Sequence, residues 1–475
     1  MPKTLKKFSF AIGALIGLLV LIAIGLRLFL DVNAYKPRFE AAASGVLGVE
    51  VSVGGRLGIG FFPGLLVTLE DVRIRNRGTD IVTAKVARLG IEFLPLLQNK
   101  VRIETVALEY ARISIEKGRD GKFNFEKSEA TRGVLPALNL ARISLTDGTL
   151  LYADKLSGKG FEAENCGLDV RRFQLSARER PGIMKYLSLA AELDCGEVRT
   201  KNYAASDLKF SVAGTNGVFD FKPLTMNVFG VQGLGSIRAD FAGAIPLYQV
   251  HYSLPRFHIE ALLKTLSPQN LAAGSMDLTV DLLMRGKTMH ELRRTARGNI
   301  SLRGKNLILE GRDLDQELAR YETSQNFNLV DVGAYILTGP IGLVVTKGYD
   351  FARIVQKSGG RSEIRTFVSD WKMDKGVARA QDVAMATNEN RIALRGSLDF
   401  ANERFAEVTV ALIDARGCAT LRQTIRGSFQ KPVVEKPSTL KALTGPVLKL
   451  FNKARGVFPG GECDVFYAGS VAPPK

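Results

Sequence analysis

Apolar and polar residues alternate along most of the chain after residue 49. A period of two is typical of strands that bury one face of a sheet and leave the other face in water. The apolar positions of the clearest runs are Leu89, Ile91 and Phe93; Ala111, Ile113 and Ile115; Leu278, Val280, Leu282 and Met284; and Val408, Val410 and Leu412. The pattern predicts a mainly β protein.

Turn signals between these runs predict how the strands connect. Asp-Gly and Asn-Gly pairs favour tight hairpins. The turn dipeptides are Asp120-Gly121, Asp147-Gly148, Asn216-Gly217 and Lys375-Gly376. Helical stretches are few, and the clearest are Asn33–Leu47, with Pro37 in its first turn, Lys287–Arg297 and Arg312–Asn326. We therefore expect a long, curled antiparallel sheet with a few short helices.

The apolar face of such a sheet must be buried or occupied. A closed barrel or a sandwich hides this face inside, whereas an open, curled sheet leaves an apolar trough. The alternation fits both arrangements, so the sequence pattern leaves this choice open.

The N-terminus carries one long apolar run. Phe8–Leu26 has no formal charge, and the run continues past Arg27 to Leu30. About 20 apolar residues cross a bilayer as a helix, and the lysines at positions 3, 6 and 7 place the N-terminus in the cytoplasm. A cleaved signal peptide has a shorter apolar region and ends in small residues. We therefore expect an uncleaved single-pass anchor, with the rest of the chain outside.

Charge and motifs narrow the class of function. The chain has 65 Lys and Arg and 48 Asp and Glu, so its net charge is +17. This charge indicates either a soluble basic surface or attraction to anionic lipid headgroups. Nucleic acid is disfavoured on the outer side of a membrane. The three His form no H-E-x-x-H motif, and Gly286-Lys287-Thr288 resembles a phosphate-binding loop whose first glycine would fall at Asp281. We expect no enzyme, no metal site and no cofactor.

Four cysteines agree with an oxidising compartment. None forms a C-x-x-C pair, which removes support for a zinc or thioredoxin-like site. Residues 161–172 and 187–198 have the pattern of strands, and Arg178–Gly182 between them has that of a turn. A hairpin centred on this turn places Cys166 opposite Cys195. The predicted disulfides are Cys166–Cys195 and, by elimination, Cys418–Cys463.

Several segments, taken in order, resemble the AsmA family of bacterial envelope proteins. They are Asp31–Pro37 directly after the apolar run, Gly55–Leu65, Val67–Ile74 with its "l-x-l-x-d-v-x-i" strand, Asp120–Phe125 with its "D-G-x-x-N" turn, and Asp374–Phe400 with its closing "G-x-l-d-f" strand. The expected domains are an anchor at 1–30, a short helix at 31–48, a β-groove domain at 49–430 with a C-terminal AsmA-like region at about 288–430, and a basic amphipathic tail at 431–475. The resemblance implies the β-groove and the AsmA-like region, whereas the cysteine pairs and the tail depart from the family pattern.

The resemblance also implies a function. AsmA-like proteins are similar to bridge-like lipid transfer proteins, which use a taco-shaped sheet with an apolar concave face. Family members sit in the bacterial inner membrane and project into the periplasm. The implied role is to bind phospholipid acyl chains and to assist phospholipid transport between the inner and outer membranes. The implied partners are phospholipid, the inner membrane and envelope proteins that continue the groove.

Two sets of residues are candidates for this role. The lipid-lining candidates are Leu89, Ile91, Phe93, Ile113, Ile115, Leu278, Val280 and Leu282. In the tail, Leu443, Leu450 and Phe451 recur at helical spacing, with Lys449 and Lys453 among them. The tail either caps the end of the sheet or contacts a membrane or a partner. Cys463 would tie it to the strand that carries Cys418.

A second hypothesis comes from another class of protein. An open sheet edge pairs with a strand of a client protein in β-augmentation. The chain would then be a non-enzymatic scaffold or an assembly factor that works with the outer-membrane protein assembly machinery. This hypothesis predicts a protein partner and a closed or dry groove.

Overall fold

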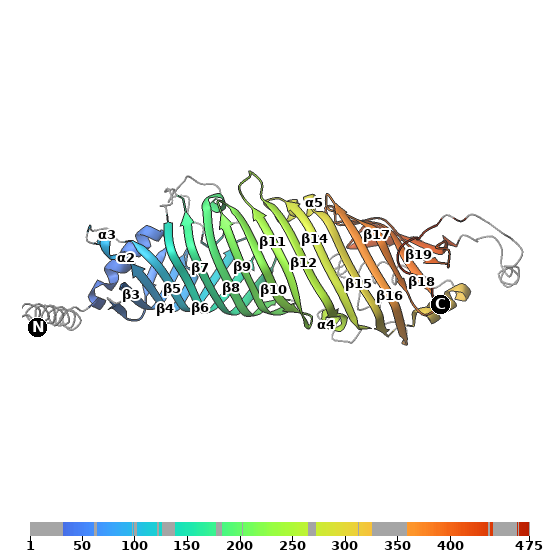
Figure 1. Ribbon diagram of the computed structural model, residues 1–475, viewed down its shortest axis with the longest axis horizontal. Coiled ribbons are helices and arrows are strands. Elements are labelled where there is room, and N and C mark those ends of the chain that lie inside the picture. Colours follow the sequence, from blue (N-terminus) through green and yellow to red (C-terminus); the bar gives the residue numbers. More distant parts are fainter. Residues whose placement is uncertain are drawn as a thin grey trace, which may run out of the picture. The chain divides into compact units, whose positions relative to one another are not determined.

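Two compact units, Met1–Arg180 and Pro181–Lys475, make up the chain (Figure 1). The computed structural model describes residues 32–60, 64–96, 98, 102–120, 123–125, 138–176, 183–201, 203–264, 272–311, 313–324, 359–435, 438–439, 463 and 465–474. Among these residues, no helix is both long and apolar enough to cross a membrane. The predicted anchor at residues 8–30 and the tail candidates Leu443, Lys449, Leu450, Phe451 and Lys453 lie outside the described residues.

The first unit, unit 1, is a sheet with short helices at its start. Its elements are η1 (Val32–Tyr35), α2 (Lys36–Leu47), β1 (Glu50–Val53), β2 (Leu57–Gly60), β3 (Leu65–Asn76), β4 (Thr79–Ile91), α3 (Phe93–Leu96), β5 (Ile103–Lys117), β6 (Leu138–Asp154) and β7 (Lys159–Leu175). Both β1 and β2 pair with β3, and β3, β4 and β5 follow in antiparallel order. The predicted helix after the anchor is confirmed by α2, which has Pro37 in its first turn.

One connection of unit 1 differs from the predicted meander. Strands β5 and β6 run parallel, with Val106 opposite Ile143 and Ile113 opposite Leu150. Residues 118–137 separate the two strands, and parallel strands need a crossover of about a dozen residues or more. The length of this connection therefore permits the chain to return to the edge where β5 began.

Asp147-Gly148 is the predicted turn that proves wrong. Both residues lie inside β6, which runs unbroken from Leu138 to Asp154. Asp147 has φ 51°, in the left-handed region that Asp tolerates better than most residues. The dipeptide therefore marks an irregularity in the pairing of β6 with β7 and does not end the strand.

Residues in the left-handed region lie at the same level of β3, β5, β6 and β7 and form a crease across unit 1, with Asp147 as the residue of β6. Asp71 of β3, Tyr110 of β5 and Asn165 of β7 have φ values of 52°, 50° and 53°. At this level the spacing between residues on the same face widens from two to three. Leu69 and Val72 both lie on one face, although the pairing with β4 continues through Glu70, which lies opposite Val86. The widening keeps residues on both sides of the crease on one face of the sheet. Irregularities of this kind increase local twist and bend a strand.

The second unit, unit 2, is a longer antiparallel sheet. Its elements are η2 (Ile183–Tyr186), β8 (Leu187–Thr200), β9 (Ala204–Thr215), β10 (Val218–Val228), β11 (Val231–Asp240), β12 (Leu247–His258), α4 (Ile259–Lys264), β13 (Ala272–Ala273), β14 (Ser275–Arg285), α5 (Met289–Thr295), β15 (Arg297–Glu310), α6 (Leu314–Ser324), β16 (Arg361–Asp374), β17 (Val377–Ala386), β18 (Arg391–Asp399), β19 (Arg404–Ile413), β20 (Ala419–Ser428), β21 (Lys431–Val434) and β22 (Ser438–Thr439).

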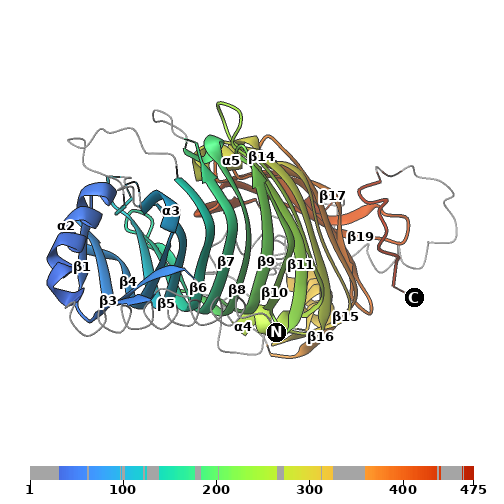
Figure 2. The same cartoon turned by 60° about the vertical axis from the view of Figure 1, so that its left-hand side comes forward.

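Neighbouring strands of unit 2 are joined mostly by short turns. Asn216-Gly217 and Lys375-Gly376 connect β9 to β10 and β16 to β17, and all four residues have positive φ, as the predicted hairpins require. Figure 2 shows the strands from β8 to β11 curving along their length. The predicted interior helices are confirmed as α5 and α6.

The main hydrophobic core of the described chain lies in the C-terminal part of unit 2. Leu262 and Leu263 of α4 and Leu314 and Leu318 of α6 pack with side chains of β12 to β20. Trp371 of β16 is 1% exposed within this cluster. The helices therefore cover one face of the sheet at this end.

The cysteines follow the sequence prediction. Cys418 and Cys463 are joined by a disulfide, with their Cα atoms 6.0 Å apart. Cys166 of β7 and Cys195 of β8 are each disulfide-bonded as well, as the predicted bridge requires, and no cysteine is free.

Candidate functional site

In each unit, one face of the sheet carries apolar side chains on most of its strands; we call it the apolar face. Residues directly opposite each other on paired strands share a face. In unit 1 this relation joins Leu89 to Val67 and Val106, and Val106 in turn to Ile143. The apolar face of unit 1 carries Val67, Leu69, Val72, Ile74, Val82, Ala84, Ala87, Leu89, Val106, Leu108, Ala111, Ile113, Ile143, Leu145, Leu150, Leu168 and Val170.

The apolar face of unit 2 is built in the same way but carries more aromatic rings. Phe210, Phe219, Phe221, Tyr248 and Tyr252 come from β9, β10 and β12. The rings of Phe210 and Phe221 lie 5.6 Å apart between centroids, and Phe241 lies 5.8 Å from Tyr248. Further along, Leu278, Val280 and Leu282 of β14 lie opposite Leu254, Tyr252 and Val250 of β12.

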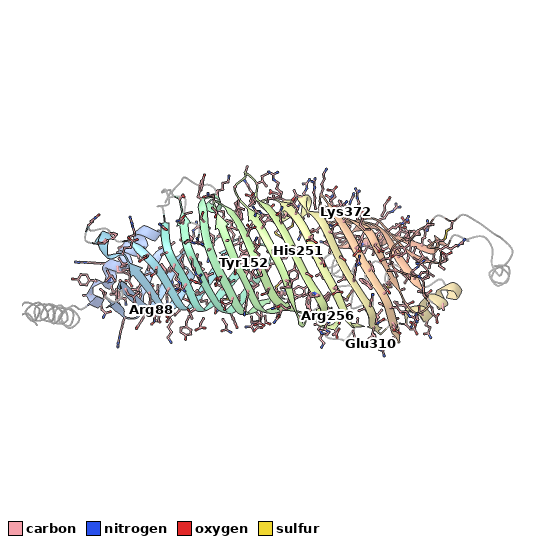
Figure 3. All side chains as sticks on the ribbon, in the orientation of Figure 1. Arg88, Tyr152, His251, Arg256, Glu310 and Lys372 are labelled. Carbon is pink, nitrogen blue, oxygen red and sulfur yellow. A yellow bond between two sulfur atoms is a disulfide. The ribbon has the colours of Figure 1, made fainter. Side chains whose placement is uncertain are left out.

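The opposite face of each sheet is polar and carries cross-strand ion pairs. Arg88 pairs with Glu109, and Arg142 Nε donates to Asp169 at 2.7 Å. Hydrogen bonds from Arg142 and Arg171 hold the pKa of Asp169 below its usual value. In unit 2, Arg238 Nη1 donates to both carboxylate oxygens of Asp220, at 3.0 and 2.9 Å. Figure 3 shows Arg88 and His251 among the side chains of the two sheets.

Seven of the eight lipid-lining candidates lie on the apolar face. Leu89, Ile91, Ile113 and Ile115 are in β4 and β5, and Leu278, Val280 and Leu282 are in β14. Phe93 is the exception, because β4 ends at Ile91 and Phe93 begins α3. The strand that the sequence predicts through Phe93 is therefore too long. A helical turn is favoured there by the Leu-Pro-Leu that follows, since proline is tolerated in a first turn.

The apolar face differs in exposure along the chain. In β16–β20 it is covered, and Met385, Ile392 and Val408 are fully buried. In β4 and β5, Leu89, Ile91 and Ile113 are only half-buried, as are Leu278 and Leu282 in β14. At the start of unit 1, Phe39 of α2 packs against the cluster around Val53 and Leu69. Helices therefore cover the apolar face at the start of unit 1 and in the C-terminal part of unit 2, and other strands of each unit carry partly exposed apolar side chains.

The hydroxyl oxygen of Tyr252 is buried on the apolar face and has no hydrogen-bond partner. Among the described residues it is the one such side-chain atom on this face. Its ring lies over Gly235 and Gly233 of β11, where any side chain would collide with the ring. Burial raises the pKa of Tyr252, and it also raises that of Tyr248. Neither tyrosine is among the residues predicted from the sequence, although both alternate in phase with Val250 and Leu254.

Two of the segments that resemble the AsmA family have a structural explanation. Asp71, the "d" of the strand motif, is the left-handed residue of the crease in β3. Asn124, from the "D-G-x-x-N" turn, accepts from Glu116 N at 3.1 Å and donates to Ser114 O at 2.7 Å. Its side chain thus takes the place of a neighbouring strand beside β5. Both residues shape the sheet and do not form a binding site.

The C-terminal residues 465–474, here called the strap, bind to the polar face of β16–β20. Phe466, Tyr467 and Val471 are buried there against small side chains such as Ala384 and Ala393. Tyr467 Oη donates to Asp382 Oδ1 at 2.5 Å, and Ser470 N and Oγ donate to Asp382 Oδ2 at 3.0 and 2.6 Å. The predicted tie between the tail and the strand bearing Cys418 is therefore confirmed.

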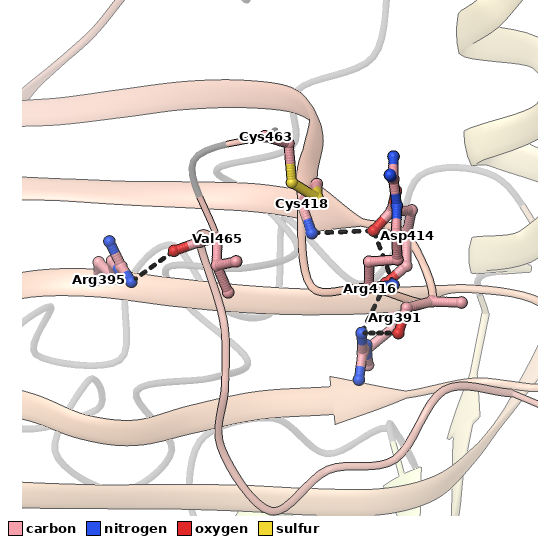
Figure 4. Close-up of a disulfide and its surroundings, with 8 residues drawn as sticks. Arg391, Arg395, Asp414, Arg416, Cys418, Cys463 and Val465 are labelled. Carbon is pink, nitrogen blue, oxygen red and sulfur yellow. Dashed lines mark hydrogen bonds and ion pairs between the residues drawn. A yellow bond between two sulfur atoms is a disulfide. The ribbon is translucent and has the colours of Figure 1, made fainter. Parts of the chain in front are cut away.

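Arginines hold the strap from the sheet side. Arg391 Nη1 donates to Val471 O at 3.0 Å, and Arg395 Nη2 donates to Val465 O at 2.9 Å. The guanidinium of Arg395 lies 5.0 Å from the centroid of the Phe466 ring, within the range of a cation–π contact. Figure 4 shows the disulfide, the bond from Arg395 to Val465 O and Asp414 accepting from Cys418 N.

No group of three His, Cys, Asp or Glu in the described part of the chain could hold a metal ion. His251 pairs with Asp281 and His258 with Glu260, and both histidines are exposed. Thr288, which ends the phosphate-loop-like tripeptide, is the N-cap of α5, and its hydroxyl accepts from Glu291 N at 3.2 Å. These residues therefore have structural roles at the surface.

The fold and its faces define a class: a mainly β protein whose curled sheets carry one apolar and one polar face. The family model of the AsmA family matches residues 1–177, so the chain is AsmA-like in this part. The match covers the region that holds η1 to β7, the crease and the Asn124 turn. No curated protein matches the chain.

Proposed function

We propose that the partly exposed apolar face binds the acyl chains of phospholipids. The chain would be held in the bacterial inner membrane by residues 8–30, with both units in the periplasm, and would assist phospholipid transport between the inner and outer membranes. It would carry lipid without changing it chemically. The observation that supports this proposal is that the apolar face of each unit has half-buried apolar side chains on several strands.

The physical argument rests on the cost of leaving such a face in water. Exposed apolar surface costs about 25 cal/mol per Å² relative to burial. Contiguous apolar patches above a few hundred Å² on soluble proteins mark binding sites. Leu89 and Ile113 lie on the apolar face of unit 1 and Leu282 lies on that of unit 2, so each unit has a partly exposed apolar surface of its own. Acyl chains would remove it from water without any specific hydrogen bond.

Such a site selects by shape and amphipathicity. Charged side chains lie on the polar face of each sheet, where they pair with one another across strands. The lipid headgroup would therefore stay at the open edge of the groove, in water. This arrangement tolerates different headgroups and excludes ligands without an apolar part.

Lipid mass spectrometry on the full chain, purified from a native-like host without exchange into detergent micelles, tests the proposal. We expect several phospholipids for each chain. A folded, monodisperse protein that carries no lipid would refute it.

Neighbouring leucines on one strand give a sharper test. Leu282 lies on the apolar face of β14, and Leu283 lies on its polar face with 38% of the residue exposed. Leu282→Asp places a carboxylate where acyl chains would lie, and we expect lipid binding to fall at least tenfold. Leu283→Asp adds the same charge on the other face and serves as the control. Equal lipid content in the two variants would contradict the apolar-face assignment.

The scaffold hypothesis is a less favoured alternative because it needs a free sheet edge. Side chains of η1 and α2 bond to the edge formed by β1 and β2: Asn33 accepts from Leu57 N, Glu40 from Val53 N and Ser44 from Val51 N. At the other end, β21 contains Pro432, which has no N–H to offer a partner strand. Covered edges and edge prolines oppose strand addition. Capture of a client protein by the lipid-free chain would revive this alternative.

A further inference from the structure

One edge of the unit 1 sheet has exposed apolar side chains next to the start of the described chain. We call it the α3 edge. It is a row of strand ends and not an outer strand of the sheet: β2 and β4 end there, and β3 and β5 begin there. Leu94 of α3 is 75% exposed, and Ile59 and Ile103 are 42% and 37% exposed. Arg102 lies beside them and pairs with Glu92 at 3.5 Å. Exposed apolar residues with a flanking cation suit the boundary of a membrane.

The direction of α2 shows which edge is closest to the preceding segment. The helix and η1 follow the strand edge in order, from Asn33 at Leu57, through Glu40 at Val53, to Ser44 at Val51. Leu57 lies three residues from the end of β2, about 10 Å at the rise of a strand. Val32 is therefore on the side of the α3 edge, and Ser44 is on the side away from it.

The chain before Val32 holds the apolar run. This run ends at Leu30, so Asp31 alone separates it from Val32, the first residue of η1. Two residues of extended chain reach about 7 Å. Tyr35, at the end of η1, is half exposed and lies 5.9 Å from the guanidinium of Arg38. Tyrosine and arginine are typical of the headgroup region of a membrane.

We propose that the α3 edge contacts the leaflet from which residues 8–30 emerge, with Leu94 inserted among the lipids. This inference rests on the proposed function for its membrane anchor. The apolar face reaches the same edge at Ile91 and Leu65, which lie opposite each other. The α3 edge would then be the place where lipid leaves the bilayer and enters the groove.

The opposite edge of unit 1 offers a matched control. Leu156, in the turn between β6 and β7, is 69% exposed and lies next to Lys155. It resembles Leu94 in size, exposure and flanking charge but lies where β6 ends and β7 begins. Because the native cysteines are all disulfide-bonded, a cysteine introduced at either position is the one free thiol in the chain.

The experiment uses the full chain in vesicles of phosphatidylethanolamine and phosphatidylglycerol. Leu94→Cys and Leu156→Cys are each labelled with an environment-sensitive fluorophore, and a fraction of the lipids carries a quencher on the acyl chain. We expect a blue shift and strong quenching for the label at position 94 and neither for the label at position 156. Two unquenched labels, or quenching at position 156 alone, would overturn the inference.

Two further measurements separate this inference from the proposed function. Leu94→Glu places a charge at the membrane contact, and we expect lipid uptake from the vesicles to slow about tenfold while the fold is kept, since the side chain is exposed. Unchanged uptake would count against the contact. If bound phospholipid is found by mass spectrometry but the label at position 94 is not quenched, only this inference fails. If the label is quenched but no phospholipid is bound, the proposed function fails instead.

Discussion

The strap depends on Asp382, and Asp382→Ala tests this dependence. The carboxylate accepts from Tyr467 Oη, Ser470 N and Ser470 Oγ, at 2.5, 3.0 and 2.6 Å. Hydrogen bonds to a charged group each contribute about 1.5–3 kcal/mol and are not additive when they share one acceptor. We therefore expect the variant to weaken strap binding by about 3–5 kcal/mol, which corresponds to a factor of about 150 to 5,000.

Hydrogen exchange of the backbone amides in residues 466–471 measures this change. In the oxidised chain the disulfide keeps the strap nearby, so faster exchange reports its release from the sheet and not its loss. Asp370→Ala is the control, because Asp370 lies opposite Asp382 on the same face and pairs with Arg303. Unchanged protection of the strap in Asp382→Ala, or equal loss in both variants, would refute the reasoning.

Three other predictions follow from described contacts. Burial raises the pKa of Asp382, but hydrogen bonds from Ser470 and Tyr467 outweigh this effect and hold the pKa below the usual 3.8. Strap binding should therefore be constant from neutral pH to about 5 and should weaken only as the pH falls through this lowered pKa. Hydrogen exchange in the strap across a pH series measures this. Reducing Cys418–Cys463 with a dithiol should raise exchange in the strap less than Asp382→Ala does, because the bonds to Gly417 O remain; full release on reduction would contradict this. Tyr252→Phe should leave the free energy of unfolding unchanged or raise it by about 1 kcal/mol, because it removes a buried hydroxyl without a partner. A clear loss of stability in calorimetry would show that the hydroxyl has a stabilising partner.

The sequence predicts the strands best where their period is unbroken. Leu278, Val280 and Leu282 alternate without interruption, and the structure puts all three on the apolar face of β14. Where the crease widens the spacing from two to three, simple alternation fails. Leu69 and Val72 share a face although they differ by an odd number. A search for spacings of two, three and two around an Asp or Asn would have found this.

Other features depend on contacts between residues far apart in the chain. Alternation shows which side chains share a face, but it does not show that α6 covers Ile392 while Leu282 stays half exposed. The strap on Asp382 joins segments more than 80 residues apart, and its signal in the sequence is a short Phe-Tyr-Ala-Gly-Ser stretch without periodicity. The parallel pairing of β5 and β6 likewise depends on a crossover and not on either strand.

The crease in unit 1 stores the bend of the sheet in single residues, one for each of β3, β5, β6 and β7. Length and curvature are therefore separate properties of this architecture. A duplicated pair of strands that keeps one left-handed residue at this level would bend in the same sense as its neighbours and lengthen the apolar face without any change elsewhere. Because β4 has no such residue of its own, evolution by tandem duplication, and engineering of longer or shorter sheets, would need to preserve this backbone conformation only once in each duplicated pair.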